Sequence, residues 1–329
     1  MSYFSTLQSV AGANLLAHWK LDDNNGSVVA DSANNYDLTL VGTNGTNYKR
    51  RQASIVRNDT SGYSMWFDGT SGHAYRNATT ALDSARTAYT LIAWCQVQPS
   101  YGGSGAILAI NNKYRFQSRN DSQFESIVTD SGSSDYTTRT SLSDFAFNKK
   151  STPNTLATHM VVMVLEPWTA NTTPCYIKIY VNGHLYATND IDPFTDNAPS
   201  APIGLANVGN GGGNYFYGWL QHVSVITTNL SQSQVHTLYQ AGVGTPVANA
   251  ATVYPWTTEI VASDPSRKRI TITNDSHYLV SLSLGGTPSY YKSIALRTGE
   301  RWTSDTYNGS INASINPNMG YADVTVMSE

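Results

Sequence analysis

Residues 175–183 read CYIKIYVNG, a run in which apolar and polar side chains alternate and which ends in Asn182-Gly183. Alternation with a period of two is typical of a β-strand with one buried face, and Asn-Gly is the strongest short signal for a hairpin turn. Residues 89–97 (YTLIAWCQV) and 157–166 (ATHMVVMVLE) have the same character. Together these segments predict antiparallel strands joined by tight turns, which is typical of a sandwich or jelly roll.

One helix is expected, at residues 231–240. Ser231 and Gln234 have the spacing of a capping box, in which each side chain bonds the backbone amide of the other residue. Val235 and Leu238 then form one apolar face, and Gly242 follows as a suitable terminator. The rest of the chain shows almost no helical periodicity.

The sequence predicts two domains. Residues 243–253 are small and uncharged, which is typical of a linker. We therefore expect a first domain at 1–242 and a second at 254–329. Alternation in the second domain is clear at 269–273, 280–284 and 322–326, which indicates a small β-sandwich or open barrel.

Several short motifs follow one another in the first domain. They are His18-Trp19-Lys20-Leu21, Val29-Ala30-Asp31-Ser32, Met65-Trp66-Phe67-Asp68-Gly69, Tyr89 to Trp94, Ile179 to Gly183 and Tyr217-Gly218-Trp219-Leu220. In this order they resemble the concanavalin A-like, laminin-G-like jelly-roll family. The resemblance implies a two-sheet sandwich with a lectin-like role. We expect the aromatic residues of these motifs to pack in its core.

The second domain has motifs of its own, ITITNDS at 270–276, LSLG at 282–285, LRTGE at 296–300 and GSINA at 309–313. They resemble small β domains of tailed-bacteriophage structural proteins. This resemblance implies a virion protein whose second domain serves attachment or oligomerisation.

Charge and apolar content exclude several classes of protein. Net charge is −3, with Lys+Arg 20 against Asp+Glu 23, so there is no basic footprint for nucleic acid. No run of eighteen apolar residues predicts a membrane span, and the first residues lack the basic region of a secretory signal. Two cysteines, eighty residues apart, give no disulfide framework.

Scarce glutamate argues against an enzyme. Laminarinase-type members of the resembled family carry two catalytic glutamates in the pattern E-x-D-x-x-E, at the spacing that a retaining mechanism requires. The five glutamates here all lie more than ten residues apart: Glu125, Glu166, Glu259, Glu300 and Glu329. The run Gly102 to Gly105 is a loop of small residues and not a nucleophile elbow. We predict a non-enzymatic protein, with an unusual pair of aspartates as the open alternative.

Calcium is the one cofactor that the resemblance implies, since laminin-G-like domains often hold it with Asp, Asn and backbone oxygens. The matching stretch is Asp31 to Asp37, and our hypothesis is that Asp31 and Asp37 bind the ion. Glycines common after the Asp-Ser pair in the family are here Ala33 and Asn34. An Asx-rich turn between two strands is the alternative.

A glycan or protein partner would be bound by aromatic rings beside amide groups in loops. The candidates are Tyr101, Tyr136, Trp168, Asn171, Asn210, Asn214, Tyr215 and Tyr217. Tyrosine in such loops also serves protein contacts, which the sequence slightly favours over glycans.

The sequence therefore predicts a homo-oligomeric protein on the outside of a bacteriophage virion, a capsid decoration or head fibre with a lectin-like domain. It would be assembled in the host cytoplasm, with other capsid or tail proteins as partners and host-surface polysaccharide as a further ligand. The alternatives are a tail-associated or secreted adhesin that binds host glycans and, more weakly, a glycan hydrolase or lyase.

Overall fold

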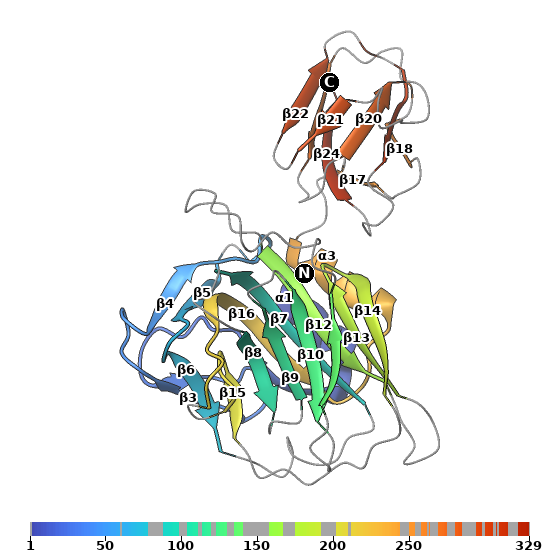
Figure 1. The fold of residues 1–329 in the computed structure, drawn as a ribbon. Coiled ribbons are helices and arrows are strands. Elements are labelled where there is room, and N and C mark those ends of the chain that lie inside the picture. Colours follow the sequence, from blue (N-terminus) through green and yellow to red (C-terminus); the bar gives the residue numbers. More distant parts are fainter. Residues whose placement is uncertain are drawn as a thin grey trace. The chain divides into compact units, whose positions relative to one another are not determined.

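A computed structural model gives the fold of the chain (Figure 1). It describes residues 2–328 except 60, 78–87, 99–103, 111–113, 120–122, 130–134, 141–157, 167–174, 192–201, 210–211, 244–249, 254–257, 262, 264–268, 275–279, 285–293, 298–299, 305–306, 308 and 315–321. The chain divides into two compact units, Met1–Gly244 and Thr245–Glu329. Each unit is described by itself.

The first unit is a sandwich of two eight-stranded antiparallel sheets. Sheet A runs β14-β13-β12-β7-β16-β5-β4, and β1 also pairs with β16. Its strands are β1 (Leu15–Trp19), β4 (Tyr48–Ala53), β5 (Tyr63–Asp68), β7 (Tyr89–Val97), β12 (Thr158–Leu165), β13 (Cys175–Val181), β14 (His184–Ile191) and β16 (Tyr217–Ile226). The predicted strands at 89–97, 157–166 and 175–181 are thus neighbours in one sheet.

Sheet B runs β11-β10-β9-β8-β15-β6-β3-β2. Its strands are β2 (Val28–Val29), β3 (Leu38–Val41), β6 (His73–Arg76), β8 (Gly105–Ile110), β9 (Tyr114–Ser118), β10 (Phe124–Thr129), β11 (Asp135–Arg139) and β15 (Ile203–Leu205). This two-sheet arrangement confirms the predicted jelly-roll class.

The core lies between the two sheets. Trp19, Leu21, Met65 and Phe67 all have exposures of 0%, so the expected inward-facing pairs are confirmed. They belong to one large cluster with residues from nearly every strand of both sheets. The hairpin after β13 is confirmed too, because Asn182 (φ 52°) and Gly183 (φ 85°) both adopt the left-handed conformation of a type I′ turn.

The predicted helix is present as α3 (Gln232–Val243). Its capping box forms: the Ser231 amide donates to Gln234 Oε1 (2.9 Å) and the Gln234 amide to Ser231 Oγ (3.3 Å). The prediction that Gly242 ends the helix was wrong. Gly242 lies inside α3, where a Cβ atom would come within 2.0 Å of the Trp94 ring, so the glycine serves close packing.

A second helix, α1 (Tyr3–Ala11), was not predicted and precedes the short 3₁₀ turn η1 (Gly12–Asn14). The Ser2 side chain caps it by accepting from the Ser5 amide at 3.2 Å. Tyr3, Leu7 and Ala11 are buried because they recur every four residues on one face. Helices α1 and α3 pack on the outer face of sheet A, over a cluster that includes Trp94 (Figure 1).

The second unit is a smaller sandwich of two four-stranded sheets, β17-β24-β19-β22 and β18-β23-β20-β21. Its strands are β17 (Ala250–Val253), β18 (Thr258–Val261), β19 (Ile270–Asn274), β20 (Val280–Leu284), β21 (Ile294–Leu296), β22 (Arg301–Ser304), β23 (Ile311–Ser314) and β24 (Ala322–Ser328). Ile272, Leu282 and Ile311 are among its core residues. The sandwich agrees with the predicted class.

One boundary needs correction, because residues 250–253 are not part of a linker. They form β17, which pairs antiparallel with β24 from Ala250 opposite Thr325 to Val253 opposite Ala322. The segment has no local strand signal, and its conformation comes from that distant partner. Among the described residues, no helix has the length and apolar character needed to cross a membrane.

Candidate functional site

Half of the predicted glycan or partner residues can be placed. Tyr101, Trp168, Asn171 and Asn210 lie outside the described residues. The other four are Tyr136, Asn214, Tyr215 and Tyr217.

The prediction that Tyr136 lies in a loop was wrong. This residue lies in β11, directly opposite Val128, and its half-buried ring packs against the core. Tyr136 is therefore no candidate for an open platform.

The other three residues lead into β16. Asn214 is exposed, and its carbonyl accepts from the Ala106 amide at 2.7 Å. The Tyr215 ring lies 5.7 Å from the His73 ring, and the Tyr217 ring lies edge-on to Trp66 at 6.0 Å. The two half-buried tyrosines thus contact different residues. Of the two, only Tyr217 lies on the outer face of sheet A, beside Trp66.

That outer face is covered at one end and open at the other. Along β7, Ile92, Trp94 and Gln96 point outward in turn. Ile92 and Trp94 are buried beneath the helices, whereas Gln96 is only half-buried. The end of sheet A near Gln96 is therefore accessible.

Two tryptophans stand on this open end. Trp66 of β5 and Trp219 of β16 are directly opposite each other in register, and both are half-buried. The expectation that these rings pack in the core was wrong for this pair. Since Met65 and Phe67 point inward, the pleat of the strand turns Trp66 outward, and this alternation is the signal that could have identified it.

Polar groups surround the two rings. Trp66 Nε1 donates to Gln98 Oε1 (3.1 Å), and Lys49 Nζ lies 4.7 Å from the centre of the Trp66 ring. Gln96 Nε2 donates to Thr158 Oγ1 at 2.8 Å. We call Trp66, Tyr217 and Trp219, with Lys49, Gln96 and Gln98 at their edges, the aromatic surface.

The turn at residues 68–72 follows β5 directly and is held by several hydrogen bonds to Asp68. Asp68 accepts from the amides of Thr70, Ser71 and Gly72. Burial raises the pKa of its carboxyl, but these bonds and one from the Asn47 side chain outweigh it, so the pKa lies below its usual range. Asp68 is therefore ionised at neutral pH and holds the turn beside Tyr217.

The aromatic surface has the composition of a carbohydrate subsite. Aromatic rings offer flat apolar area with little loss of side-chain entropy, and neighbouring amides can bond hydroxyl groups. The Lys49 contact is worth only about 0.5–1 kcal/mol at an exposed site, so a sugar ring can displace it.

Asp31 and Asp37 lie in the turn for which a calcium ion was hypothesised, and both oxygens of Asp31 and one of Asp37 accept from backbone amides. Asp31 Oδ1 accepts from the amides of His18 (2.8 Å) and Ala33 (2.9 Å). Its Oδ2 accepts from the amides of Asn34 and Tyr36, both at 3.1 Å. Asp37 Oδ1 accepts from the Asp31 amide at 2.8 Å.

These contacts form the Asx-rich turn that the sequence offers as the alternative. In the described part of the chain, no group of three or more His, Cys, Asp or Glu side chains is arranged to hold a metal ion.

We expect Asp31→Ala to lower the free energy of unfolding by about 2–3 kcal/mol, because several amide hydrogen bonds to a charged group are lost. Calcium or a chelator should leave the melting temperature of the unchanged chain where it is. Thermal melts with both additives test this, with the exposed neighbour Asp22→Ala as control. A calcium-dependent rise that disappears in Asp31→Ala would contradict this expectation and support the calcium hypothesis.

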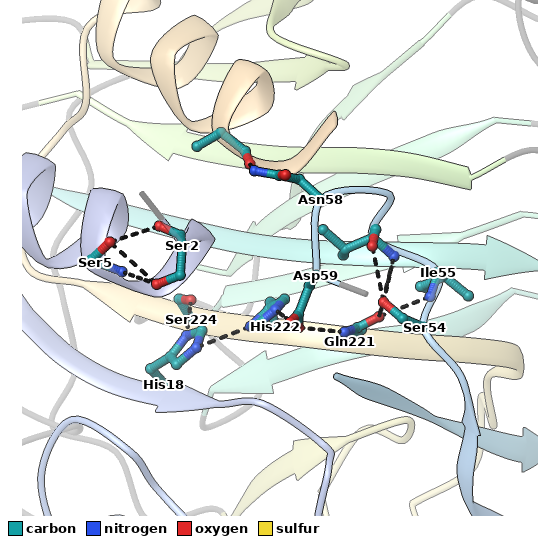
Figure 2. Close-up of polar contacts among 12 residues, drawn as sticks. Ser2, Ser5, His18, Ser54, Ile55, Asn58, Asp59, Gln221, His222 and Ser224 are labelled. Atoms are coloured by element: carbon teal, nitrogen blue, oxygen red, sulfur yellow. Dashed lines mark hydrogen bonds and ion pairs between the residues drawn. The ribbon is translucent and has the colours of Figure 1, made fainter. Parts of the chain in front are cut away.

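A buried polar network lies beneath α1 (Figure 2). Ser224 Oγ is 2.8 Å from His18 Nδ1, and His18 Nε2 is 3.2 Å from His222 Nδ1. His222 Nε2 lies 2.9 Å from Asp59 Oδ2, which also accepts from Gln221 Nε2 at 3.0 Å. No local pattern connects these residues, which come from three separate segments, β1, the β4–β5 connection and β16.

The network has one direction of hydrogen bonding when both histidines are neutral. The His222 hydrogen bond lowers the pKa of Asp59 more than burial raises it, so the Asp59 carboxylate accepts and His222 Nε2 donates. His222 Nδ1 must then accept from His18 Nε2, and His18 Nδ1 accepts from the Ser224 hydroxyl. We assign these proton positions from the network itself.

Burial gives this network a structural role, although it contains the residue types of a catalytic triad. Ser224 and His18 both have exposures of 0%. The Phe4 ring stacks on His18 at 4.6 Å and the Tyr3 ring lies 4.8 Å from His222. No substrate can reach Ser224 while α1 is in place.

Comparison with known proteins bears on the fold. The family model of the concanavalin A-like lectin/glucanases superfamily matches residues 68–236. None of the curated proteins compared with the chain matches it.

The solved structures that resemble the chain include a sialidase and two toxin domains. Trypanosoma rangeli sialidase in complex with sialic acid has 16% identity and a TM-score of 0.48, over 72% of this chain and 34% of the sialidase. The botulinum neurotoxin serotype D binding domain has 12% identity and a TM-score of 0.50, over 87% and 63%. The receptor binding domain of the mosaic serotype C/D toxin has 11% identity and a TM-score of 0.50, over 86% and 61%.

The chain spans only a third of the sialidase and less than two thirds of the toxin domains. At 11% and 12% identity, the likeness to the toxin domains concerns the fold alone. The family match is more specific, because it covers just over half of the chain and includes β7, β12, β13 and β16. The chain belongs to the concanavalin A-like lectin/glucanases superfamily.

Proposed function

We propose that this chain is a non-enzymatic carbohydrate-binding protein displayed on the surface of a bacteriophage virion, as a capsid decoration or head fibre. The aromatic surface carries the proposal. Trp66 and Trp219 are presented side by side on a rigid sheet, and sites built on strands hold their geometry better than sites on loops.

The ligand that suits this surface is a neutral polysaccharide. Rings and amides dominate it, and Lys49 and Asp68 are its charged neighbours, with Asp68 committed to its own turn. A neutral sugar chain needs stacking and hydroxyl contacts more than charge.

Two of the described glutamates support a binding role over hydrolysis. Glu125 is contacted by two arginines and Glu166 by Lys178. Both carboxylates are therefore engaged in ion pairs, Glu125 in sheet B and Glu166 directly after β12 of sheet A. Paired carboxylates flanking an open cleft would be needed for glycoside hydrolysis.

The second unit suits attachment to a particle or oligomerisation, because it has a core of its own and does not contribute to the aromatic surface. Homo-oligomers would multiply weak sugar contacts into firm adhesion. The toxin domains with the same fold are named binding domains, which agrees with a role in attachment.

A glycan array tests the carbohydrate part of the proposal. We expect the full chain to bind neutral bacterial surface polysaccharides and to release no reducing ends from them. An array without any neutral ligand would contradict binding, and released reducing ends would overturn the non-enzymatic assignment.

Labelled antibody on intact particles tests the virion part. We expect label on the head of particles that carry this chain. Label confined to the tail would favour the adhesin alternative, and the absence of label from every particle would contradict a virion location.

A further inference from the structure

Three arginines lie together on the outer face of sheet B, in a chain of which only 13% is charged. Arg115 and Arg119 lie on either side of Gln117, at and just beyond β9, and Arg139 ends β11. Phe116 points the other way, into the core, so the arginines point outward. Both helices lie on the side of sheet A, so neither helix packs on this face (Figure 1).

A buried carboxylate organises the arginines. Gln117, Glu125 and Arg139 lie directly opposite one another across β9, β10 and β11, and Glu125 is only 1% exposed. Gln117 Nε2 and Arg139 Nε donate to its two oxygens, and Arg119 Nη1 lies 3.4 Å from both. Glu125 is thus the counter-charge that holds two guanidinium groups on the sheet.

The terminal guanidinium nitrogens of Arg139 are not used in the contact with Glu125. The residue contacts Glu125 through Nε, and its side chain is 49% exposed. Within the described residues its two terminal nitrogens have no other partner. A guanidinium held by Nε presents a planar fork that matches a carboxylate with two parallel hydrogen bonds.

A donor and an acceptor without partners lie on the same face. Arg115 Nε and Gln117 Oε1 are buried, and neither has a hydrogen-bond partner. Buried polar groups are nearly always satisfied, by protein, water or ligand. This observation does not depend on the charges of the arginines. It points to a ligand with hydroxyl groups, which can both donate to Gln117 Oε1 and accept from Arg115 Nε.

A second ion pair lies on this face. Arg115 Nη2 lies 3.8 Å from Asp135 Oδ2, and Asp135 Oδ1 also accepts from Thr129 Oγ1 at 2.6 Å. Among the described residues, this face thus holds three arginines beside the carboxylates of Glu125 and Asp135.

We propose that the outer face of sheet B is a second binding site, which takes an acidic glycan by its carboxylate. Arg139 binds the carboxylate, Glu125 is the positioning residue, and Arg115 and Gln117 contact neighbouring hydroxyls. The inference rests on the proposed carbohydrate-binding function, but it uses the opposite sheet from the aromatic surface.

Titration of the full chain with polygalacturonate tests the site, and the fully methyl-esterified polymer is the matched neutral ligand. We expect the acid form to bind and the ester to bind at least about tenfold more weakly, because the bidentate pair is lost. Arg139→Gln should cause a similar loss. Arg51→Gln removes the same charge from an exposed position on β4 and should change the affinity less than about twofold.

Glu125→Gln separates positioning from simple charge attraction. Removing a negative charge would strengthen the binding of any anion by long-range attraction alone. If Glu125 positions the guanidinium groups, the variant binds polygalacturonate more weakly, although it has one negative charge fewer. Melting curves check that the variant is folded, and Arg139→Gln, at an exposed side chain, keeps the test valid if it is not.

Three results would overturn the site: equal binding of acid and ester, equal losses in Arg139→Gln and Arg51→Gln, or tighter binding of dextran sulfate, which would replace the carboxylate by a sulfate ester. Neutral glycan binding at the aromatic surface is measured separately on the same variants. Arg139→Gln should leave it unchanged, so failure of this site and failure of the proposed function are distinguishable.

Discussion

Lowering the pH from 6.5 to 4.5 is expected to cost the protein about 4–5 kcal/mol of unfolding free energy, from two histidines alone. Burial, with His222 and Lys20 nearby, holds the pKa of His18 well below 6.5. Burial, with His236 nearby, lowers the pKa of His184 to about 3.

The sign follows from proton uptake. Below pH 6.5 the unfolded chain protonates both histidines, while the folded chain keeps them neutral. The unfolded state therefore binds more protons, and stability falls as the pH falls, by about 2 kcal/mol per histidine over these two pH units. Asp59 and Asp68 have lowered pKa values and lose their contribution only below their ordinary value of 3.8, outside this window. Burial raises the pKa of Asp23, which acts in the opposite direction.

Urea unfolding followed by tryptophan fluorescence at pH 6.5 and 4.5 measures the effect. His18→Gln should remove about half of the pH dependence, because glutamine does not titrate. Ser224→Ala is the matched control: it breaks the hydrogen bond to His18 Nδ1 but keeps the imidazole, so it should lower stability equally at both pH values. An unchanged pH dependence in His18→Gln would show that His18 is not held neutral.

Local periodicity predicted the strands and α3 well, because each depends on neighbours within a few residues. Tyr89–Val97 forms β7 with the expected bounds, and the Ser231–Gln234 capping box is present. The same approach missed α1, in which the spacing of Tyr3, Leu7 and Ala11 by four is obscured by other apolar residues between them, Phe4 and Val10. Its stability comes from packing on sheet A, which no local pattern reveals.

The candidate sites depend on pairs that are remote in sequence. His18 and His222 are 204 positions apart, and the bulge that gives His222 its φ of 52° is a property of β16 pairing with β7. Glu125 meets Arg139 only through the register of β10 with β11. The outward position of Trp66 was the exception, since it follows from the inward positions of Met65 and Phe67.

Replacing both tryptophans of the aromatic surface, in Trp66→Ala/Trp219→Ala, is expected to weaken binding of a neutral polysaccharide at least about 30-fold. Aromatic anchors at a binding site contribute about 2 kcal/mol or more each, and 1.4 kcal/mol is a factor of ten. The two losses need not add, since the rings share one ligand, so the bound is set by a single ring.

Tyr176→Ala is the matched control for this variant. Tyr176 is 39% exposed on β13, four strands from β5 in sheet A, so its ring lies about 19 Å from Trp66 at the usual strand spacing. Its loss should leave the affinity unchanged. Because Trp66 and Trp219 are half-buried, Trp219→Tyr is included to keep a ring at the site with little loss of packing, and it should retain most of the binding. If the double alanine variant binds as tightly as the unchanged chain, or if Tyr176→Ala weakens binding equally, the sugar is held elsewhere.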